Sequence, residues 1–230
     1  MSGSELNVVL VHGAWADGSS WSKVIRKLHL NGLKAVTVPV PLTSFADDVA
    51  ALDRTLERTQ GPIVLVGHAY AGAVIGSARN PRIKALVYVA ALAPAEGETV
   101  ADVFYRNEPH PKAPELAPDT NGLIWLPEEA FAAAFAQNAT PDELAVLAAV
   151  QRPISPACIS VPVGRALWKD VPSWYLLAEQ DHMIAADTQR FMAERMKARV
   201  SAHAVDHTPS VSAPDVVVDL ILDAVREARA

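Results

Sequence analysis

Short apolar runs alternate with helical patterns along most of this chain, and this alternation restricts the possible folds more than any other feature. Residues 6–11, Leu-Asn-Val-Val-Leu-Val, are rich in β-branched residues and show no polar alternation, which is typical of a strand buried on both faces. The next segment has apolar residues at helical spacing, namely Trp21, Val24, Ile25 and Leu28. This order predicts a strand followed by a covering helix.

The same succession continues to the end of the chain. Further strands are expected at residues 35–40, 63–67, 83–92, 174–178 and roughly 200–205, with Pro41 ending the first of these. Helices are expected at about 45–56 and 70–78, and in the amphipathic segment from Val216 to Val225. We therefore predict a single α/β domain over residues 1–230, built on a mostly parallel sheet of about six strands with helices on both faces.

The alternation stops between Pro94 and about Pro172. Nine prolines between residues 109 and 162 leave only short helical patches in this interval, such as 128–137 and 141–151. This interval is too interrupted to form a core of its own. We predict that residues from about 95 to 170 are a mostly helical cap insertion over the carboxyl ends of the strands.

The composition restricts the partners of the chain. There are 26 Asp and Glu residues against 20 Lys and Arg, and a net charge of −6 repels phosphate backbones, so we expect no nucleic-acid partner. The one cysteine, Cys158, allows no internal disulfide, and the first residues lack the charged and apolar regions of a signal peptide. No apolar run reaches the roughly 18 residues that cross a bilayer. We expect a cytoplasmic protein without a membrane partner, and a homodimer is left open.

Three segments that carry small or polar residues follow predicted strands. Residues 12–15 (His-Gly-Ala-Trp) follow the first strand, and residues 67–72 (Gly-His-Ala-Tyr-Ala-Gly), which we call the elbow, follow the third. Asp181 and His207 follow the last two strands. Together these segments resemble the α/β-hydrolase family over essentially the whole chain, most closely its small bacterial and plant branch of esterases and hydroxynitrile lyases. The resemblance implies a three-layer α/β-hydrolase fold.

The elbow departs from the family pattern at its central position. Members normally carry Gly-His-Ser-x-Gly-Gly there, with the serine as nucleophile on a sharp turn between strand and helix. Ala69 stands at the nucleophile position, so no acyl-enzyme can form on that side chain. Because Ala71 also replaces a glycine of the motif, natural divergence is favoured over a deliberate change of serine to alanine, although both explanations stay open.

The acid and base positions of the family are occupied by Asp181 and His207, in the family's chain order. A carboxylate that accepts a hydrogen bond from one ring nitrogen leaves the other free to take a proton near neutral pH. We therefore predict that His207 is a general base, paired with Asp181 and facing the methyl group of Ala69. Asp206 is a rival partner, but adjacent side chains at a strand end point to opposite sides. A loop histidine without chemistry is the other interpretation of His207.

The resemblance also implies an oxyanion hole and a substrate pocket. The oxyanion donors would be the backbone N–H groups of Ala14 and Tyr70, with the Tyr70 side chain pointing away. The sequence contains no spacing typical of metal ligands and no glycine-rich phosphate loop, so we expect no metal and no cofactor. Candidate substrate-binding residues are His12, Trp15, Phe104, Trp125 and Met183, although each is about as consistent with simple packing, and His12 more often holds its loop.

These features predict an enzyme that acts on a small apolar carbonyl or ester compound through a His207–Asp181 dyad, without a serine nucleophile. The dyad would activate water or take a proton from the substrate, as in lyase chemistry. Two alternatives remain. The chain is a serine esterase inactivated by a serine-to-alanine change at Ala69, or it is a non-catalytic protein that binds a small molecule on the same fold.

Overall fold

A computed structural model describes residues 6–229, and its strands form one sheet in the order β2-β1-β3-β4-β5-β6. Every pair of neighbouring strands is parallel, which confirms the predicted α/β sheet. Residues 1–5, on which the signal-peptide expectation partly rests, lie outside the described residues. The strands are β1 (Asn7–Val11), β2 (Lys34–Val38), β3 (Ile63–His68), β4 (Ile83–Val89), β5 (Ser173–Ala178) and β6 (Arg199–His203).

Helices connect the strands and form the remaining ordered elements. None of the described helices is long and apolar enough to span a membrane. The α-helices are α1 (Ser22–Leu30), α2 (Phe45–Arg58), α3 (Ala71–Gly76), α4 (Val100–Phe104), α5 (Glu128–Ala130), α6 (Pro141–Val150), α7 (Ala186–Arg195), α8 (Pro209–Ser212) and α9 (Pro214–Ala228). Shorter turns are the 3₁₀ helices η1 (Gly18–Trp21), η3 (Pro156–Cys158) and η4 (Leu167–Lys169) and the π-helix η2 (Phe131–Phe135).

Most predicted boundaries lie within about three residues of the observed ones; the strand expected at 83–92, for example, is β4 and ends at Val89. Strand β2 ends at Val38 and not at Val40, because Pro39 follows and has no N–H group to continue the ladder. Helix α2 begins where we expected, since the side chain of Ser44 accepts a hydrogen bond from the backbone N–H of Asp47. Local sequence signals therefore place most elements within a few residues.

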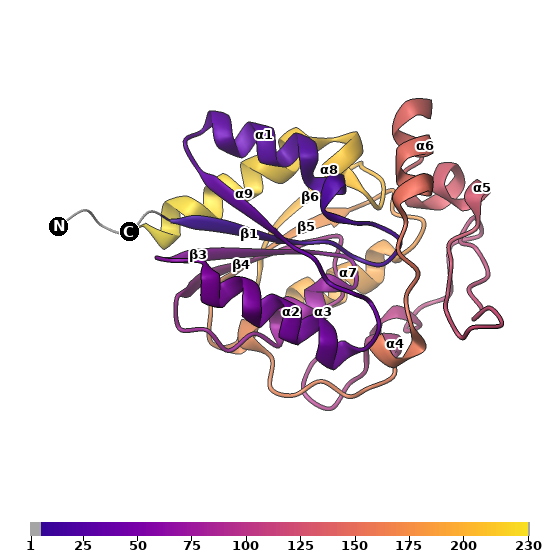
Figure 1. Ribbon diagram of the computed structural model, residues 1–230, viewed down its shortest axis with the longest axis horizontal. Coiled ribbons are helices and arrows are strands. Elements are labelled where there is room, and N and C mark those ends of the chain that lie inside the picture. The colour runs from indigo at the N-terminus through magenta and orange to yellow at the C-terminus, as the bar shows by residue number, and fades with distance from the viewer. Residues whose placement is uncertain (1–5, 230) are drawn as a thin grey trace.

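Two apolar layers hold the sheet between its helices. Residues from α1 and α9 pack with one face of the sheet, and residues from α2, α3 and α7 pack with the other. Figure 1 shows α1 and α9 on one side of the strands and α2 and α3 on the opposite side. Helices cover both faces of the central strands β1, β3 and β5, which are therefore buried at every position, whereas the edge strands β2 and β6 are partly exposed.

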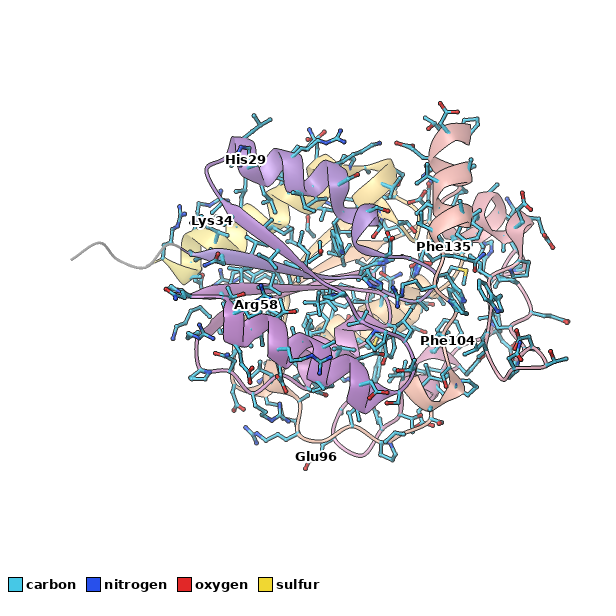
Figure 2. All side chains as sticks on the ribbon, viewed as in Figure 1. His29, Lys34, Arg58, Glu96, Phe104 and Phe135 are labelled. Atoms are coloured by element: carbon cyan, nitrogen blue, oxygen red, sulfur yellow. The ribbon has the colours of Figure 1, made fainter. Side chains whose placement is uncertain are left out.

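The helices α4, α5 and α6 of the segment 95–170 lie at one end of the sheet. In Figure 1, helices α4, α5 and α6 gather at the end opposite the one where α9 finishes, and the labelled Phe104 and Phe135 occupy the same end in Figure 2. The segment is helical only in short stretches, which is less than we expected, and residues 105–127 contain no helix. The prolines account for this, because each removes a backbone donor that a longer helix needs.

Candidate active site

The elbow between β3 and α3 holds Ala69 in a left-handed backbone conformation, with φ of 50°. A residue other than glycine persists in this region only where its surroundings hold it there. The backbone N–H of Ala69 donates to the carbonyl of Val89 at 3.2 Å, and its carbonyl accepts from the N–H of Leu92 at 2.9 Å. The end of β4 thus fixes the sharp turn, as the family resemblance implies.

Three glycines around the elbow are required by close backbone approach. A Cβ atom on Gly67 would lie 2.8 Å from the carbonyl oxygen of Ala71, and one on Gly72 would lie 2.4 Å from that of Leu92. A Cβ atom on Gly13 would lie 2.9 Å from the Cβ atom of Ala69. Real Cβ atoms do not tolerate such contacts, so the spacing of these glycines is a packing requirement.

Asp181 and His207 are in direct contact and buried. Nδ1 of His207 donates to Oδ2 of Asp181 at 2.8 Å. Oδ1 of the same carboxylate accepts from the backbone N–H groups of Met183 at 2.7 Å and Ile184 at 2.8 Å, and Oδ2 also accepts from Nε2 of Gln189 at 2.8 Å. Each oxygen therefore has two donors, which hold the carboxylate in one orientation.

The other ring nitrogen of His207 is available to a ligand. Within residues 6–229, Nε2 of His207 has no hydrogen-bond partner, and the residue lines the pocket described below. The imidazole is packed between the ring of Phe135, at a centroid distance of 5.3 Å, and that of His68, at 4.9 Å. Because Asp181 occupies Nδ1–H, the lone pair of the neutral ring is on Nε2.

The carboxylate of Asp206, the other possible partner of His207, binds other groups. Its Oδ1 accepts from Oγ of Ser212 at 2.6 Å and from the N–H of Thr208 at 3.2 Å, and its Oδ2 accepts from the N–H of Asn138 at 2.9 Å. Asp206 thereby ties the 95–170 segment to the loop that carries His207. Neighbouring side chains at this strand end do diverge, as the sequence interpretation assumed.

Ala14 and Tyr70, the two residues expected to supply the oxyanion donors, lie with Ala69 and His207 in the lining of one pocket. In the described part of the chain, neither backbone N–H has an acceptor. The phenol of Tyr70 points away from the site and donates to Oδ2 of Asp48 at 2.7 Å. Burial raises the pKa of Tyr70, so its hydroxyl does not ionise to replace the missing nucleophile.

The pocket itself is small and almost entirely apolar. Its volume is about 60 Å³, and its lining includes Trp15, Phe104 and Met183, three of the candidate substrate-binding residues. Trp15 is held there by two hydrogen bonds, from its indole N–H to the carbonyl of Ile124 and from its backbone N–H to that of Arg152, both of 3.0 Å. Among the described residues, no Asp, Glu, Lys or Arg side chain lines the pocket, and His207 is the one histidine in its lining.

Trp125 and His12 do not line this pocket, which corrects two predictions. Trp125 is 45% exposed and its indole N–H donates to Asp119, because its neighbour Ile124 pairs with Ile154 and turns inward, and successive side chains of an extended segment point to opposite sides. His12 is buried and donates from Nδ1 to the carbonyl of Gly13 at 2.9 Å. Burial lowers the pKa of His12 to about 4, so it holds its loop as a neutral ring.

Sequence reasoning missed two residues that orient the dyad. Gln189, on α7, is fully buried and binds Asp181, while Phe135, on the π-helix η2, packs on His207 and accepts a hydrogen bond from Oγ1 of Thr208 at 2.6 Å. Neither residue stands in a recognisable motif, and only the packing of α7 and η2 on the sheet brings them to the dyad. Among the described residues, no group of three or more His, Cys, Asp or Glu side chains could hold a metal ion.

Comparison with known proteins finds relatives that match nearly the whole chain. Alpha/beta hydrolase nvfD of Aspergillus novofumigatus is 24% identical over 247 residues, covering 96% of this chain and 97% of that protein. A variant of tomato methylketone synthase I, complexed with beta-ketoheptanoate, has a TM-score of 0.84 at 17% identity and covers 98% of this chain and 99% of its own. A pyrethroid hydrolase from Sphingobium faniae JZ-2 has a TM-score of 0.80 at 21% identity, covering 98% and 100%.

A family model gives the assignment. Residues 8–220 match the model of the alpha/beta hydrolase family, so the match runs from β1 into α9 and includes the elbow, Asp181 and His207. The solved structures share the fold across nearly their whole length. The chain therefore belongs to the alpha/beta hydrolase family.

Proposed function

We propose that this chain is an enzyme that converts a small apolar carbonyl or ester compound without a covalent intermediate. The observation that carries the proposal is the Asp181–His207 contact of 2.8 Å, in a pocket that also exposes the methyl group of Ala69. A protein that only binds its ligand has no need of an imidazole oriented by a carboxylate. The 95–170 segment acts as the cap that excludes water from this pocket.

In this proposal, His207 is the general base. Its Nε2 accepts a proton, and the carboxylate of Asp181 stabilises the imidazolium that forms. The apolar walls increase this stabilisation, because electrostatic interactions are stronger where water is excluded. The proton returns from Nε2 to the product in the second half of the reaction.

The oxyanion donors are the backbone N–H groups of Ala14 and Tyr70. When a carbonyl carbon is attacked or its neighbouring carbon loses a proton, negative charge develops on the carbonyl oxygen. Two N–H groups that have no other acceptor stabilise that charge without reorganisation. This part of the site uses backbone atoms only, so the change of the nucleophile position to alanine leaves it intact.

Two reactions fit such a site. In the first, His207 takes a proton from water, the hydroxide adds to the carbonyl carbon, and the tetrahedral intermediate expels the leaving group, which takes the proton from His207. In the second, His207 takes a proton from the carbon beside the carbonyl, the enolate forms on the oxyanion donors, and the enolate then expels a leaving group from its β-carbon, which takes the proton from His207. Neither reaction needs an oxygen on residue 69.

A serine esterase altered at one position is the second candidate. The elbow favours it, because the backbone of Ala69 keeps the left-handed conformation, with φ of 50°, that presents a nucleophile in this family. On this interpretation Ala69→Ser restores the ancestral activity. Ala71 is evidence against this second candidate, because a change made to remove the nucleophile would leave the nearby glycine of the motif unaltered.

The test compares the unaltered protein with His207→Ala and Ala69→Ser on one panel of compounds. The panel contains short esters, lactones, pyrethroid esters and β-keto acids, the last two because of the compounds named for the similar solved structures. The proposal expects turnover by the unaltered protein, its loss in His207→Ala, and no labelling by a serine-directed phosphonate. A control variant, His29→Ala, changes an exposed histidine on α1 and leaves turnover unchanged.

The outcomes separate the candidates. If Ala69→Ser gains labelling and ester hydrolysis by several orders of magnitude while the unaltered protein is inactive, the altered esterase is correct, since loss of a triad member costs on the order of 10⁶ in rate. Turnover that survives in His207→Ala contradicts the proposed base. If panel compounds bind but none is turned over, the chain is a non-catalytic protein that binds a small molecule.

A further inference from the structure

A second cavity adjoins the catalytic pocket on the side of the 95–170 segment. It has a volume of about 340 Å³, and it shares four lining residues with the inner pocket, which are Phe104, Tyr105, Leu116 and Met183. These four residues line both cavities, whereas His207 lines only the smaller one. We call the two spaces the inner and the outer chamber.

The inner chamber is too small for most of a substrate molecule. Its volume of about 60 Å³ leaves room for roughly four to six water-sized groups, at about 10–15 Å³ for each. Binding pockets for complete small molecules are several times larger, at about 300–1,000 Å³. Only a narrow part of a substrate therefore reaches His207, and the outer chamber is the adjoining space that can take the remainder.

The outer chamber differs from the inner one in chemistry. Its remaining wall comes from two stretches, residues 107–109 and 113–115, and from Ala185 at the start of α7. Asn107 is anchored, because its side-chain amide donates to Oγ1 of Thr188 on α7 at 2.8 Å. Glu108 and Glu115 are exposed carboxylates on this wall, whereas no carboxylate lines the inner chamber.

The cationic side chains near this wall do not line the chamber. The guanidinium of Arg106 lies over the ring of Phe191, 3.6 Å from its centroid, and Lys112 is exposed outside the lining. An anionic group in the outer chamber would meet two carboxylates without a cation in the wall. Groups that are neutral or positively charged meet no such repulsion.

We infer that the outer chamber is a substrate subsite for a bulky group without negative charge, joined to a slender carbonyl-bearing end that reaches His207. This inference rests on the proposed function, and it names the substrate class as elongated ketones or esters that are unbranched at the reacting end. A compact substrate, or one with a carboxylate on its far end, does not fit the two chambers.

The experiment measures binding, so that it does not depend on turnover. The probes are 2-pentanone, which fills the inner chamber alone, and three 6-aryl-2-hexanones whose ring carries a hydroxyl, an aminomethyl or a carboxylate group. Titration calorimetry with the unaltered protein is expected to show the hydroxyl and aminomethyl probes binding at least about tenfold more tightly than 2-pentanone. The carboxylate probe is expected to lose most of that gain.

Two pairs of variants locate the effect. Ala113→Trp fills the outer chamber and is expected to remove the gain of the long probes while 2-pentanone binds as before; Thr120→Trp, on an exposed position that lines neither chamber, is the control. Glu115→Gln is expected to improve binding of the carboxylate probe selectively. Glu129→Gln, an exposed carboxylate on α5, is its control.

Clear results overturn the subsite. The inference is wrong if the long neutral probes bind no more tightly than 2-pentanone, if none of the probes binds, or if Ala113→Trp weakens all probes equally. Failure of the proposed function looks different. In that case the long probes bind and respond to Ala113→Trp, but no panel compound is turned over and His207→Ala changes nothing.

Discussion

Nε2 of Gln189 donates a hydrogen bond of 2.8 Å to Oδ2 of Asp181, the same oxygen that accepts from His207. The amide of Gln189 is itself fixed, since its Oε1 accepts from the backbone N–H of Ala178 at 3.0 Å and its Nε2 also donates to the carbonyl of Ile184 at 2.9 Å. Helix α7 thus connects the end of β5 to the carboxylate. Gln189 is a positioning residue for the dyad.

Gln189→Leu tests this role. We expect the free energy of unfolding to fall by about 1–3 kcal/mol, because the N–H of Ala178 is left buried without an acceptor. The proposed turnover should fall as well, because Asp181 loses one of its four donors. The control is Thr59→Val, which removes a hydrogen bond of 2.8 Å from Oγ1 of the buried Thr59 to the carbonyl of Thr55 on α2, away from both chambers. Denaturant unfolding and turnover are measured for both, and an equal loss of turnover would mean that Gln189 acts through stability alone.

Acid should destabilise the protein through two buried histidines. Burial lowers the pKa of His68 to about 3 and that of His12 to about 4, whereas a histidine in the unfolded chain titrates near 6.5. Below pH 6.5 the unfolded chain binds protons that the native chain does not, so the free energy of unfolding falls by about 1.4 kcal/mol per pH unit for each group. The loss contributed by His12 stops near pH 4, and that of His68 near pH 3.

Urea unfolding at pH 7, 6 and 5 measures this slope. His68→Gln keeps a side-chain donor toward the carbonyl of His207, which Nε2 of His68 contacts at 2.7 Å, and should reduce the slope by one proton. The control variant Thr120→Ala changes an exposed residue without a titratable group and should leave the slope unchanged. A slope in His68→Gln that equals that of the unaltered protein would refute the assignment.

Gly72 and Gly76, both on α3, should respond oppositely to a methyl group. A Cβ atom at position 72 would lie 2.4 Å from the carbonyl oxygen of Leu92, so we expect Gly72→Ala to lose about 1–3 kcal/mol of stability or more. At position 76 the nearest atom would be Oη of Tyr88 at 3.5 Å, which is ordinary contact. Gly76→Ala should be neutral or gain up to about 1 kcal/mol of helix propensity. Thermal unfolding of both variants decides the matter, and equal losses would contradict the packing argument.

Trp15 and Trp125 should differ in their effect on ligand binding. Trp15 lines the inner chamber and its ring lies edge-on to Phe135 at 6.3 Å, whereas Trp125 faces outward. We expect Trp15→Ala to change the Kd of 2-pentanone, because it removes a chamber wall, and Trp125→Ala to leave that Kd unchanged. Calorimetric titration measures both. A larger effect at position 125 would show that the outward placement of Trp125 does not hold in solution.

Several parts of this site follow from local signals in the sequence. The apolar runs that became β1 and β3 end at His12 and His68, and parallel strands bring their carboxyl ends to one edge. The elbow needs its glycines for contacts within a few residues or with the adjoining strand end. For these reasons the fold and the contact between Asp181 and His207 could be predicted from the sequence.

The tertiary structure alone decided which residues surround the dyad. Gln189 and Phe135 reach Asp181 and His207 because α7 and η2 pack beside the carboxyl ends of the strands. No local pattern encodes a contact between residues 72 positions apart, such as Phe135 and His207, or even the contact over eight positions between Asp181 and Gln189. The inward turn of Ile124 in place of Trp125 depends on pairing with Ile154. Backbone hydrogen bonding and backbone sterics act over a few residues, so helices, strands and turns can be predicted from the sequence. Side-chain packing depends on which elements the complete fold brings together, so the neighbours of Asp181 and His207 cannot be predicted in the same way.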